Sequence, residues 1–209
     1  MEIQTQKISN GVKNKILIIV VILLVLAIGI GIGIYFFQDD QGKGSGSVYG
    51  PEATEGGARL EKEAFSVNMP EGWSEMGAPT GISAMAVNTS EEITDPAAKK
   101  INFRTYFSVV YDTLNGRTNE DYVQFLKDSL DQTIPGVVIT KEGQGEIDNQ
   151  GAHFIEMEFN QREIDFKVLL VAVYGEGNDV WIVSFNTPKT SWDKYRDLFY
   201  QTVDSFSMK

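Results

Sequence analysis

The feature that most limits what this chain can fold into is an unbroken apolar run from Ile16 to Phe37. A helix of about 22 residues is roughly 33 Å long, which matches a hydrocarbon core of about 30 Å. The run is longer than the apolar part of a cleaved signal and ends in Tyr35-Phe36-Phe37 rather than at a small-residue cleavage site. We therefore predict an uncleaved transmembrane signal anchor over residues 16–37. A core helix is the alternative, and the apolar residues all around the helix disfavour it.

The charges on either side of this run predict its orientation. Lys7, Lys13 and Lys15 precede it, whereas Asp39 and Asp40 follow it. Because positive residues stay on the cytoplasmic side, residues 1–15 should form a short cytoplasmic tail. We thus expect a single-pass protein of the cell membrane that contacts the lipid bilayer through residues 16–37 and carries its C-terminal domain outside the cytoplasm.

Two glycines of the predicted span suggest a homodimer. Gly29 and Gly33 are four residues apart, and such small residues let two helices approach closely. The alternative is that glycine is simply common in membrane spans.

Residues 38–60 are rich in glycine, serine and charge and have little to bury, so they are predicted to be a flexible linker. An exposed tether of this kind is also readily cut by proteases. Residues 61–209 should then form one extracytoplasmic domain.

Composition excludes several classes of function. The chain has a formal net charge of −11, and from Glu61 onward 24 Asp and Glu face 13 Lys and Arg. Such an acidic domain repels phosphate backbones, so no nucleic-acid partner is expected. The net charge has two interpretations: solubility alone, or attraction of cations or of a basic partner. The absence of cysteine excludes disulfides, thiolate nucleophiles, Cys-ligated zinc and a lipid-bearing cysteine.

The periodicity of the domain predicts an α+β fold, with helices packed on the faces of an antiparallel sheet. Strands are expected at Phe65–Val67, at 82–87, at 101–111, at 137–140 before a turn around Gly143–Gly145, at 153–160, at 164–175 and at 180–187. The long strand at 164–175 is apolar on both faces and should be central. The segment 88–100 is expected to be an exposed loop or a short helical turn.

Two helices are predicted from their apolar stripes. The first begins at Thr118, has Asp121 at a capping-box spacing and stops at Pro135-Gly136. Its stripe is Tyr122, Phe125, Leu126, Leu130 and Ile134. The second begins near Thr190-Ser191, and its stripe is Trp192, Tyr195, Phe199, Val203 and Phe206.

The order of these elements resembles the PsbP-like superfamily over residues 64–208. The resemblance depends on Phe65, Pro70, Gly72 and Trp73, on Trp181, Ser184 and Phe185, and on Trp192, Tyr195, Phe199, Ser205 and Phe206. It implies a PsbP-like α+β domain that is non-catalytic and docks onto larger assemblies. The membrane span in place of a lipidated cysteine departs from the envelope members of the superfamily.

The candidate chemistry is sparse. His153 is the only histidine and lies in phase with Ile155 and Met157, so we interpret it as a half-buried or edge residue rather than a catalytic one. Glu156 and Glu158 share one strand face and, with Asp165, could serve a hydrolase or a cation site; an ordinary solvated strand face is the alternative.

Two further motifs lie in segment 88–100. Glu91, Glu92 and Asp95 could bind calcium weakly, but they lack the order of an EF-hand loop. Asn88-Thr89-Ser90 matches the N-glycosylation sequon. No catalytic, cofactor-binding or metal-binding residue, and no cofactor, is predicted.

The leading hypothesis is therefore a membrane-anchored, extracytoplasmic, non-catalytic binding or scaffold module, whose partner is an envelope protein or assembly. One alternative is a hydrolase that uses Glu156, Glu158 and Asp165. Another is a binder of cations or small ligands at the membrane surface.

Overall fold

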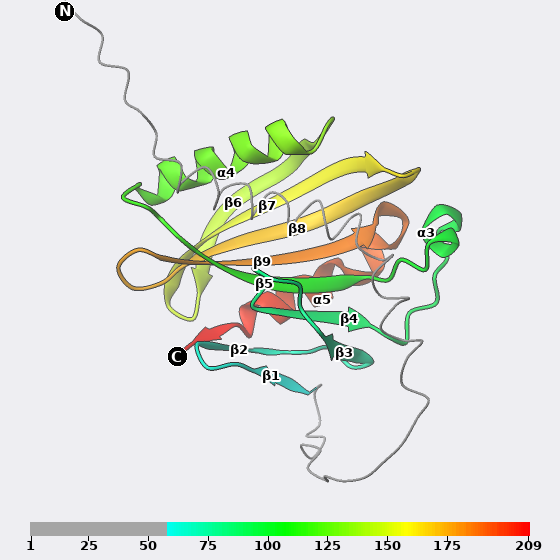
Figure 1. Cartoon of the computed structure of the whole chain (residues 1–209), viewed down its shortest axis with the longest axis horizontal. Coiled ribbons are helices and arrows are strands. Elements are labelled where there is room, and N and C mark those ends of the chain that lie inside the picture. Colours follow the sequence, from blue (N-terminus) through cyan, green and yellow to red (C-terminus); the bar gives the residue numbers. More distant parts are fainter. Residues whose placement is uncertain (1–57) are drawn as a thin grey trace, which may run out of the picture.

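The computed structural model describes residues 58–209 of the protein (Figure 1). The predicted cytoplasmic tail, the membrane span with Gly29 and Gly33, and the linker up to residue 57 lie outside the described residues. Within residues 58–209, no helix has the length and apolar character needed to cross a bilayer.

A seven-stranded, fully antiparallel sheet forms the centre of the domain (Figure 1). Its order is β3-β4-β5-β9-β8-β7-β6. The strands are β3 Trp73–Met76, β4 Ala84–Asn88, β5 Tyr106–Thr113, β6 Val138–Ile147, β7 Gln150–Gln161, β8 Ile164–Tyr174 and β9 Asp179–Pro188. The predicted α+β fold is confirmed, and β8 is an inner strand as its two apolar faces required.

A second, three-stranded sheet has the order β1-β2-β10 and consists of β1 Arg59–Glu61, β2 Phe65–Asn68 and β10 Ser207–Met208. It corrects two predictions. Phe65–Val67 is a strand but not part of the main sheet, and the ordered domain begins before Glu61. Leu60 is buried in the core beside β2, so Arg59–Glu61 pairs as a strand rather than extending the linker.

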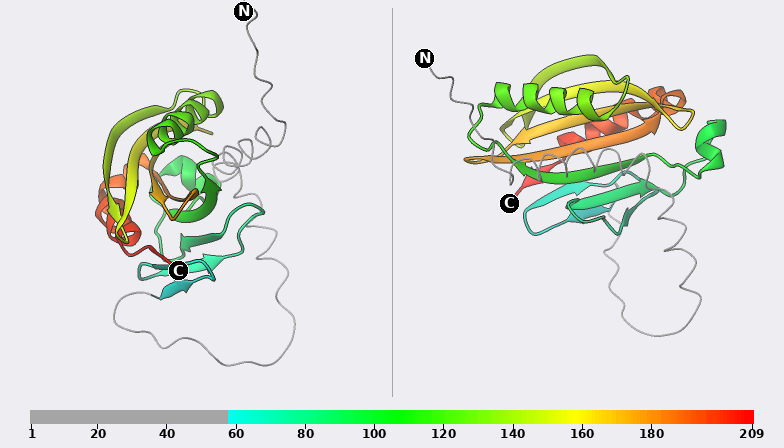
Figure 2. Two further views of the ribbon diagram at one scale, coloured as in Figure 1. Left: turned by 90° about the vertical axis from the view of Figure 1, so that its left-hand side faces the viewer. Right: turned by 45° about the horizontal axis from the view of Figure 1, so that its top comes forward.

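The two faces of the main sheet bury separate cores, and Figure 2 shows that each face is covered by a different long helix. The helix α4 (Asn119–Thr133) packs on one face with the short helix α3 (Pro96–Lys100). The helix α5 (Trp192–Asp204), which follows the 3-10 turn η1 (Lys189–Ser191), packs on the other face with the three-stranded sheet. We call these the α4 face and the α5 face.

Both long helices follow their predicted boundaries. The Thr118 side chain accepts a 3.1 Å hydrogen bond from the N–H of Asp121, which satisfies a free donor at the start of α4. Gly136 adopts a φ of 75° just after the end of α4. The predicted stripes face the sheet: in α4 all members are buried except the half-buried Phe125, and all stripe residues of α5 are buried.

The predicted strand 101–111 begins later than expected. β5 starts at Tyr106, and Phe103 precedes it on the α4 face, where its ring lies 4.9 Å from that of Phe166. Phe107 and Val109 occupy the α5 face instead. The segment before β5 leaves the extended conformation at Asn102, whose φ is 52°, and this breaks the alternation that the sequence suggests.

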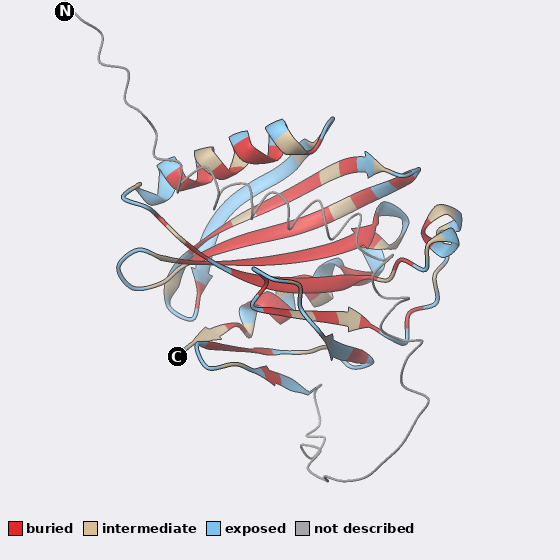
Figure 3. Ribbon diagram, viewed as in Figure 1, coloured by how far each residue is buried: buried red, intermediate tan, exposed pale blue. Residues whose placement is uncertain are grey.

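The predicted turn at Gly143–Gly145 is wrong. β6 continues through both glycines, and the hairpin to β7 closes at Asp148-Asn149, whose φ values are 54° and 59°. A two-residue hairpin turn of type I′ requires positive φ at both positions, which Asp and Asn tolerate. Figure 3 shows that β8 is mostly buried, whereas β6 is exposed over most of its length.

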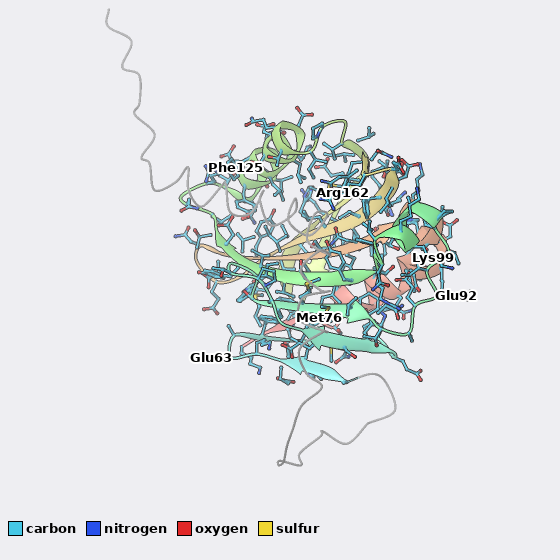
Figure 4. The ribbon with its side chains drawn as sticks, turned by 45° about the vertical axis from the view of Figure 1, so that its right-hand side comes forward. Glu63, Met76, Glu92, Lys99, Phe125 and Arg162 are labelled. Carbon is cyan, nitrogen blue, oxygen red and sulfur yellow. The ribbon has the colours of Figure 1, made fainter. Side chains whose placement is uncertain are left out.

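The β7–β8 turn and α3 lie at the same end of the molecule. Figure 4 labels Arg162 in this turn and Lys99 in α3, and Lys100 Nζ lies 3.3 Å from Glu163 Oε2. Both side chains are exposed, so this ion pair contributes little to stability.

Candidate functional site

An open groove of about 560 Å³ lies on the α5 face, between the edge strand β6 and the C-terminal half of α5. It is lined by β6 from Lys141 to Ile147, by Phe154 and Glu156 of β7, and by Tyr200, Gln201, Val203 and Asp204 of α5. The groove exists because α5 covers the inner strands and leaves the last strand uncovered.

Two glycines of β6 leave this groove open. Gly143 and Gly145 alternate with Gln144, so both turn toward the α5 face, on which the neighbouring Ile147 is buried. A Cβ at Gly143 would meet no atom of residues 58–209 within 4 Å, so this part of the domain leaves the space above it empty. A Cβ at Gly145 would lie 3.0 Å from the ring of Phe154, which therefore lies close over this backbone.

Stacked aromatic rings form the floor of the groove. The rings of Phe154 and Tyr200 have centroids 6.0 Å apart and planes inclined by 20°. Lys141 Nζ lies 5.5 Å from the centroid of the Tyr200 ring, within the range of a cation–π contact. The groove thus combines an apolar floor with a cation at one end.

Glu156 lies beneath the end of the groove at which Lys141 stands. Glu156 is only 6% exposed, and its Oε1 accepts a 2.9 Å hydrogen bond from the Tyr200 hydroxyl. Lys141 and Lys167 each place Nζ 3.5 Å from a Glu156 oxygen, which compensates the buried charge. Burial, followed by the hydrogen bond to Glu156, raises the pKa of Tyr200, so its hydroxyl stays protonated as a donor.

Glu158 lies on the same face, as predicted, and is also paired. Lys189 donates a 2.6 Å hydrogen bond to its Oε2, and Lys167 Nζ lies 3.2 Å from Oε1. The hydrogen bond from Lys189 is the main reason that the pKa of Glu158 is lowered. A carboxyl with a lowered pKa is a poor general acid, which disfavours glycoside hydrolysis at this face.

Asp165, the third predicted carboxylate, is near the β7–β8 turn. It accepts a 2.8 Å hydrogen bond from Asn160, its cross-strand partner. The three carboxylates therefore share the α5 face, and each accepts a hydrogen bond from a different side chain: Tyr200, Lys189 or Asn160. No buried side-chain nitrogen or oxygen of residues 58–209 lacks a hydrogen-bond partner.

His153 is buried on the α4 face, rather than half-buried. Its Nε2 lies 2.8 Å from Glu142 Oε1 on β6, and Lys127 Nζ of α4 lies 3.0 Å from Oε2 of the same carboxylate. The hydrogen bond from Lys127 lowers the pKa of Glu142, and the bond with His153 acts in the same direction. This chain ties α4 to the edge strand, which is a structural role.

The candidate calcium ligands Glu91, Glu92 and Asp95 do not converge. Glu91 is buried, not exposed, and accepts hydrogen bonds from the backbone N–H and the hydroxyl of Thr105. Asp95 caps α3 by accepting from the N–H groups of Ala97 and Ala98. In the described part of the chain, no group of three or more His, Asp or Glu side chains is arranged to hold a metal ion.

Asn88 of the sequon is likewise part of the fold. It is 5% exposed at the end of β4, and its Nδ2 donates a 3.1 Å hydrogen bond to the Tyr195 hydroxyl. The folded domain thus hides the nitrogen to which a glycan would be attached.

The aromatic residues that carry the family resemblance lie in one core on the α5 face. Phe65 contacts Trp181 at 5.0 Å between ring centroids, Phe185 contacts Phe199 at 4.9 Å, and Trp73 contacts Phe199 at 6.5 Å. Ser205 Oγ accepts a 2.9 Å hydrogen bond from the N–H of Asn68, which joins the end of α5 to β2.

Known proteins similar to this one are found by comparing structures and not by comparing sequences. No protein-family model matches the sequence, and no curated protein matches it. The solution structure of cyanobacterial PsbP from Synechocystis sp. PCC 6803 is similar, with a TM-score of 0.54, 16% identity and coverage of 78% of this chain and 98% of that one.

The protein has the PsbP/Mog1-like fold. LpqN, which is involved in cell envelope biogenesis of Mycobacterium tuberculosis, matches with a TM-score of 0.54 and 12% identity over 76% of this chain and 87% of that one. The Ran-binding protein Mog1p of Saccharomyces cerevisiae matches with a TM-score of 0.51 and 13% identity over 71% of this chain and 93% of that one. At these identities the PsbP/Mog1-like fold is what is shared.

The sequence did not reveal the groove. The alternation of Gly143 and Gly145 with polar residues could have signalled an edge strand with an open face, but glycine in a charged segment favours a turn more often. Tyr200 directly follows Phe199 of the buried stripe, and nothing local to α5 indicates that it meets β7.

Proposed function

We propose that this protein is a non-catalytic binding module, anchored by residues 16–37 and displayed outside the cytoplasm, that docks an envelope protein through β6 and its groove. The observation that carries the proposal is the edge strand itself. Thr140 to Glu146 are all exposed, and they border a groove with an aromatic floor. A long exposed edge next to a concave apolar surface is a common site of protein recognition.

The pairing of the charged groups supports binding rather than catalysis. Glu156, Glu158 and Asp165 each have a hydrogen-bond partner, and the pKa of Glu158 is lowered. Among similar structures, Mog1p is a Ran-binding protein and LpqN is involved in cell envelope biogenesis. A binding role at the envelope is consistent with both.

The experiment is cross-linking of the full-length protein in its native membrane, followed by purification in mild detergent and mass spectrometry. We expect a reproducible partner cross-linked to Lys141 or to α5 next to the groove. Recovery of the protein alone, or only as a dimer linked through residues 16–37, contradicts the proposal.

The hydrolase alternative has its own test. The triple variant Glu156→Gln, Glu158→Gln and Asp165→Asn should leave any partner capture in place, and wild-type protein should show no turnover on a glycan panel. Turnover that the triple variant loses while it remains folded would replace the binding proposal with the enzymatic one.

A further inference from the structure

Within residues 58–209 the outer edge of β6 has no strand beside it, because the sheet order gives this strand only β7 as a neighbour. Building on the proposed function, we propose that β6 binds an extended segment of its partner as an eighth strand. The segment carries aromatic or bulky apolar side chains toward the groove and Lys or Arg on the opposite side. Strand addition of this kind uses main-chain hydrogen bonds for affinity and alternate side chains for specificity.

The backbone of β6 offers the hydrogen bonds that a new strand needs. The β6–β7 hairpin has a two-residue turn. Ile147 of β6 and Gln150 of β7 flank this turn, so they form a hydrogen-bonded pair. Alternate residues then turn outward, so the N–H and C=O groups of Glu142, Gln144 and Glu146 point away from β7. These groups line the side on which the partner strand would lie.

The groove on the α5 face determines which side chains fit on one side of the partner strand. A partner residue opposite Gly143 or Gly145 meets no side chain on β6, and residues 58–209 leave the space above Gly143 empty. A large side chain there can cross over the glycine and reach the rings of Phe154 and Tyr200. Aromatic residues are known to cover glycines of a neighbouring strand in this way, and they add stacking with the floor.

The α4 face of β6 determines which side chains fit on the other side of the partner strand. Glu142, Gln144 and Glu146 point to this side, and within residues 58–209 Glu146 has no ion-pair partner. Partner residues opposite them lie within cross-strand contact distance, where an opposite charge is favourable. The acidic domain as a whole also attracts a basic segment. Alternating aromatic and basic residues therefore fit both sides of β6.

A second copy of this chain fits the edge poorly. If two β6 strands paired antiparallel about Gln144, Glu142 of one copy would lie opposite Glu146 of the other, and like charges in that position are destabilising. The bulge between Ile139 and Lys141 and the charged residues along the edge also hinder self-pairing.

The test measures binding of a fluorescent peptide to the full-length protein in mild detergent. The probe is a peptide of about nine residues in which Tyr and Lys alternate, which spans an edge strand of this length. Two control peptides have the same length: one groups the same residues into a Tyr block and a Lys block, and the other alternates Tyr with Glu. Hydrogen exchange with mass spectrometry locates the site.

Two variants of β6 remove one part of the site each. Gly143→Val fills the slot above the backbone without a clash and should weaken binding of the alternating peptide about tenfold or more. Gln144→Pro removes one outward N–H from an edge strand, where proline is tolerated, and should also weaken binding about tenfold. The matched control on the opposite edge strand β3 is Ser74→Val, which should bind like wild type. Gln144→Ala keeps the outward N–H and should weaken binding far less than Gln144→Pro.

Support requires that the alternating Tyr–Lys peptide binds, protects β6 from exchange, and loses affinity in both β6 variants. Equal binding by Gly143→Val, by the block peptide or by the Tyr–Glu peptide overturns the inference. If no peptide binds while cross-linking still finds a partner at Lys141 or at α5 next to the groove, this inference fails and the proposed function remains. A partner cross-linked elsewhere on the domain contradicts both. If sedimentation shows a dimer that Gln144→Pro dissociates, the occupant is a second copy and the inference also fails.

Discussion

The hydroxyl of Tyr200 on α5 donates a 2.9 Å hydrogen bond to Oε1 of Glu156, which is buried in the middle of β7. This contact joins the helix to the strand next to the edge strand and fixes the Tyr200 ring as the floor of the groove. The carboxylate satisfies the hydroxyl, and the hydroxyl in turn helps to compensate a buried charge.

Tyr200→Phe should therefore destabilise the domain while preserving its shape. We expect a loss of about 1–3 kcal/mol in the free energy of unfolding, since a buried carboxylate loses a hydrogen bond. Denaturant titration measures it. The control is Tyr111→Phe, whose hydroxyl bonds Asp179 on the surface; it should change stability by less than about 0.5 kcal/mol. Equal losses in both variants would contradict the role assigned to Tyr200.

Stability should fall on acidification partly through Glu158. Its pKa is lowered in the folded protein by the hydrogen bond from Lys189, so its contribution is fully present above its ordinary pKa of 4.5. The contribution is lost as the pH falls through the lowered value. The same bond raises the pKa of Lys189, so the contribution of the lysine is lost only above its ordinary value of 10.5.

The variant Lys189→Met tests this linkage. Its thermal unfolding is measured between about pH 3 and pH 7, the range in which carboxylates titrate. The variant should lose stability at neutral pH and show a smaller further loss on acidification than wild type. Lys99→Met removes an exposed lysine of α3 and should leave the acid profile unchanged. An unchanged acid profile in the Lys189 variant would show that the ion pair is not maintained in solution.

Phe199 is the centre of the aromatic core on the α5 face. Its ring is fully buried and contacts those of Trp73, Phe185, Trp192 and Tyr195. Phe199→Ala should cost about 3–5 kcal/mol, because the rings around it cannot all close the cavity. Leu198→Ala, at the preceding half-buried position, should cost clearly less in the same denaturant titration. The reverse order would show that the helix packs with a different face.

Thr118 caps α4 through its side-chain oxygen. Thr118→Ala should reduce the free energy of unfolding by about 1 kcal/mol, whereas Thr118→Ser keeps the acceptor and should retain most of it. Circular dichroism during urea unfolding measures both variants. A loss as large in the Ser variant as in the Ala variant would mean that the methyl group, not the cap, matters.

Much of the fold could be predicted because its signals are local. The stripes of α4 and α5 repeat with the helix period, and Thr118 and Pro135-Gly136 mark the ends of α4. The strand β8 is apolar on both faces, which predicted its central position. The predicted strands at 153–160, 164–175 and 180–187 are neighbours in the sheet and are joined by hairpins in the structure.

The errors occurred where sequence neighbours have different tertiary surroundings. Glycine allows both a turn and an open strand, and only pairing with β7 makes 143–145 a strand. Phe103 and Phe107 share a phase in the sequence, but Phe103 lies before the start of β5 at Tyr106, and the two rings belong to opposite cores. Glu91 lies in an acidic segment that predicts an exposed loop, yet Thr105 offers it a buried hydrogen-bonding site.

What the sequence alone determined is the α+β class, the helix boundaries, the central position of β8 and the face shared by Glu156 and Glu158, because these depend on periodicity and capping within one segment. Only the tertiary structure decided that Lys141, Lys167 and Lys189 neutralise those glutamates, that Tyr200 meets Glu156, and that β6 borders an open groove. These facts depend on which surface of α5 lies over which strand, and no periodicity within a single segment encodes the distance between residues that are 44 positions apart.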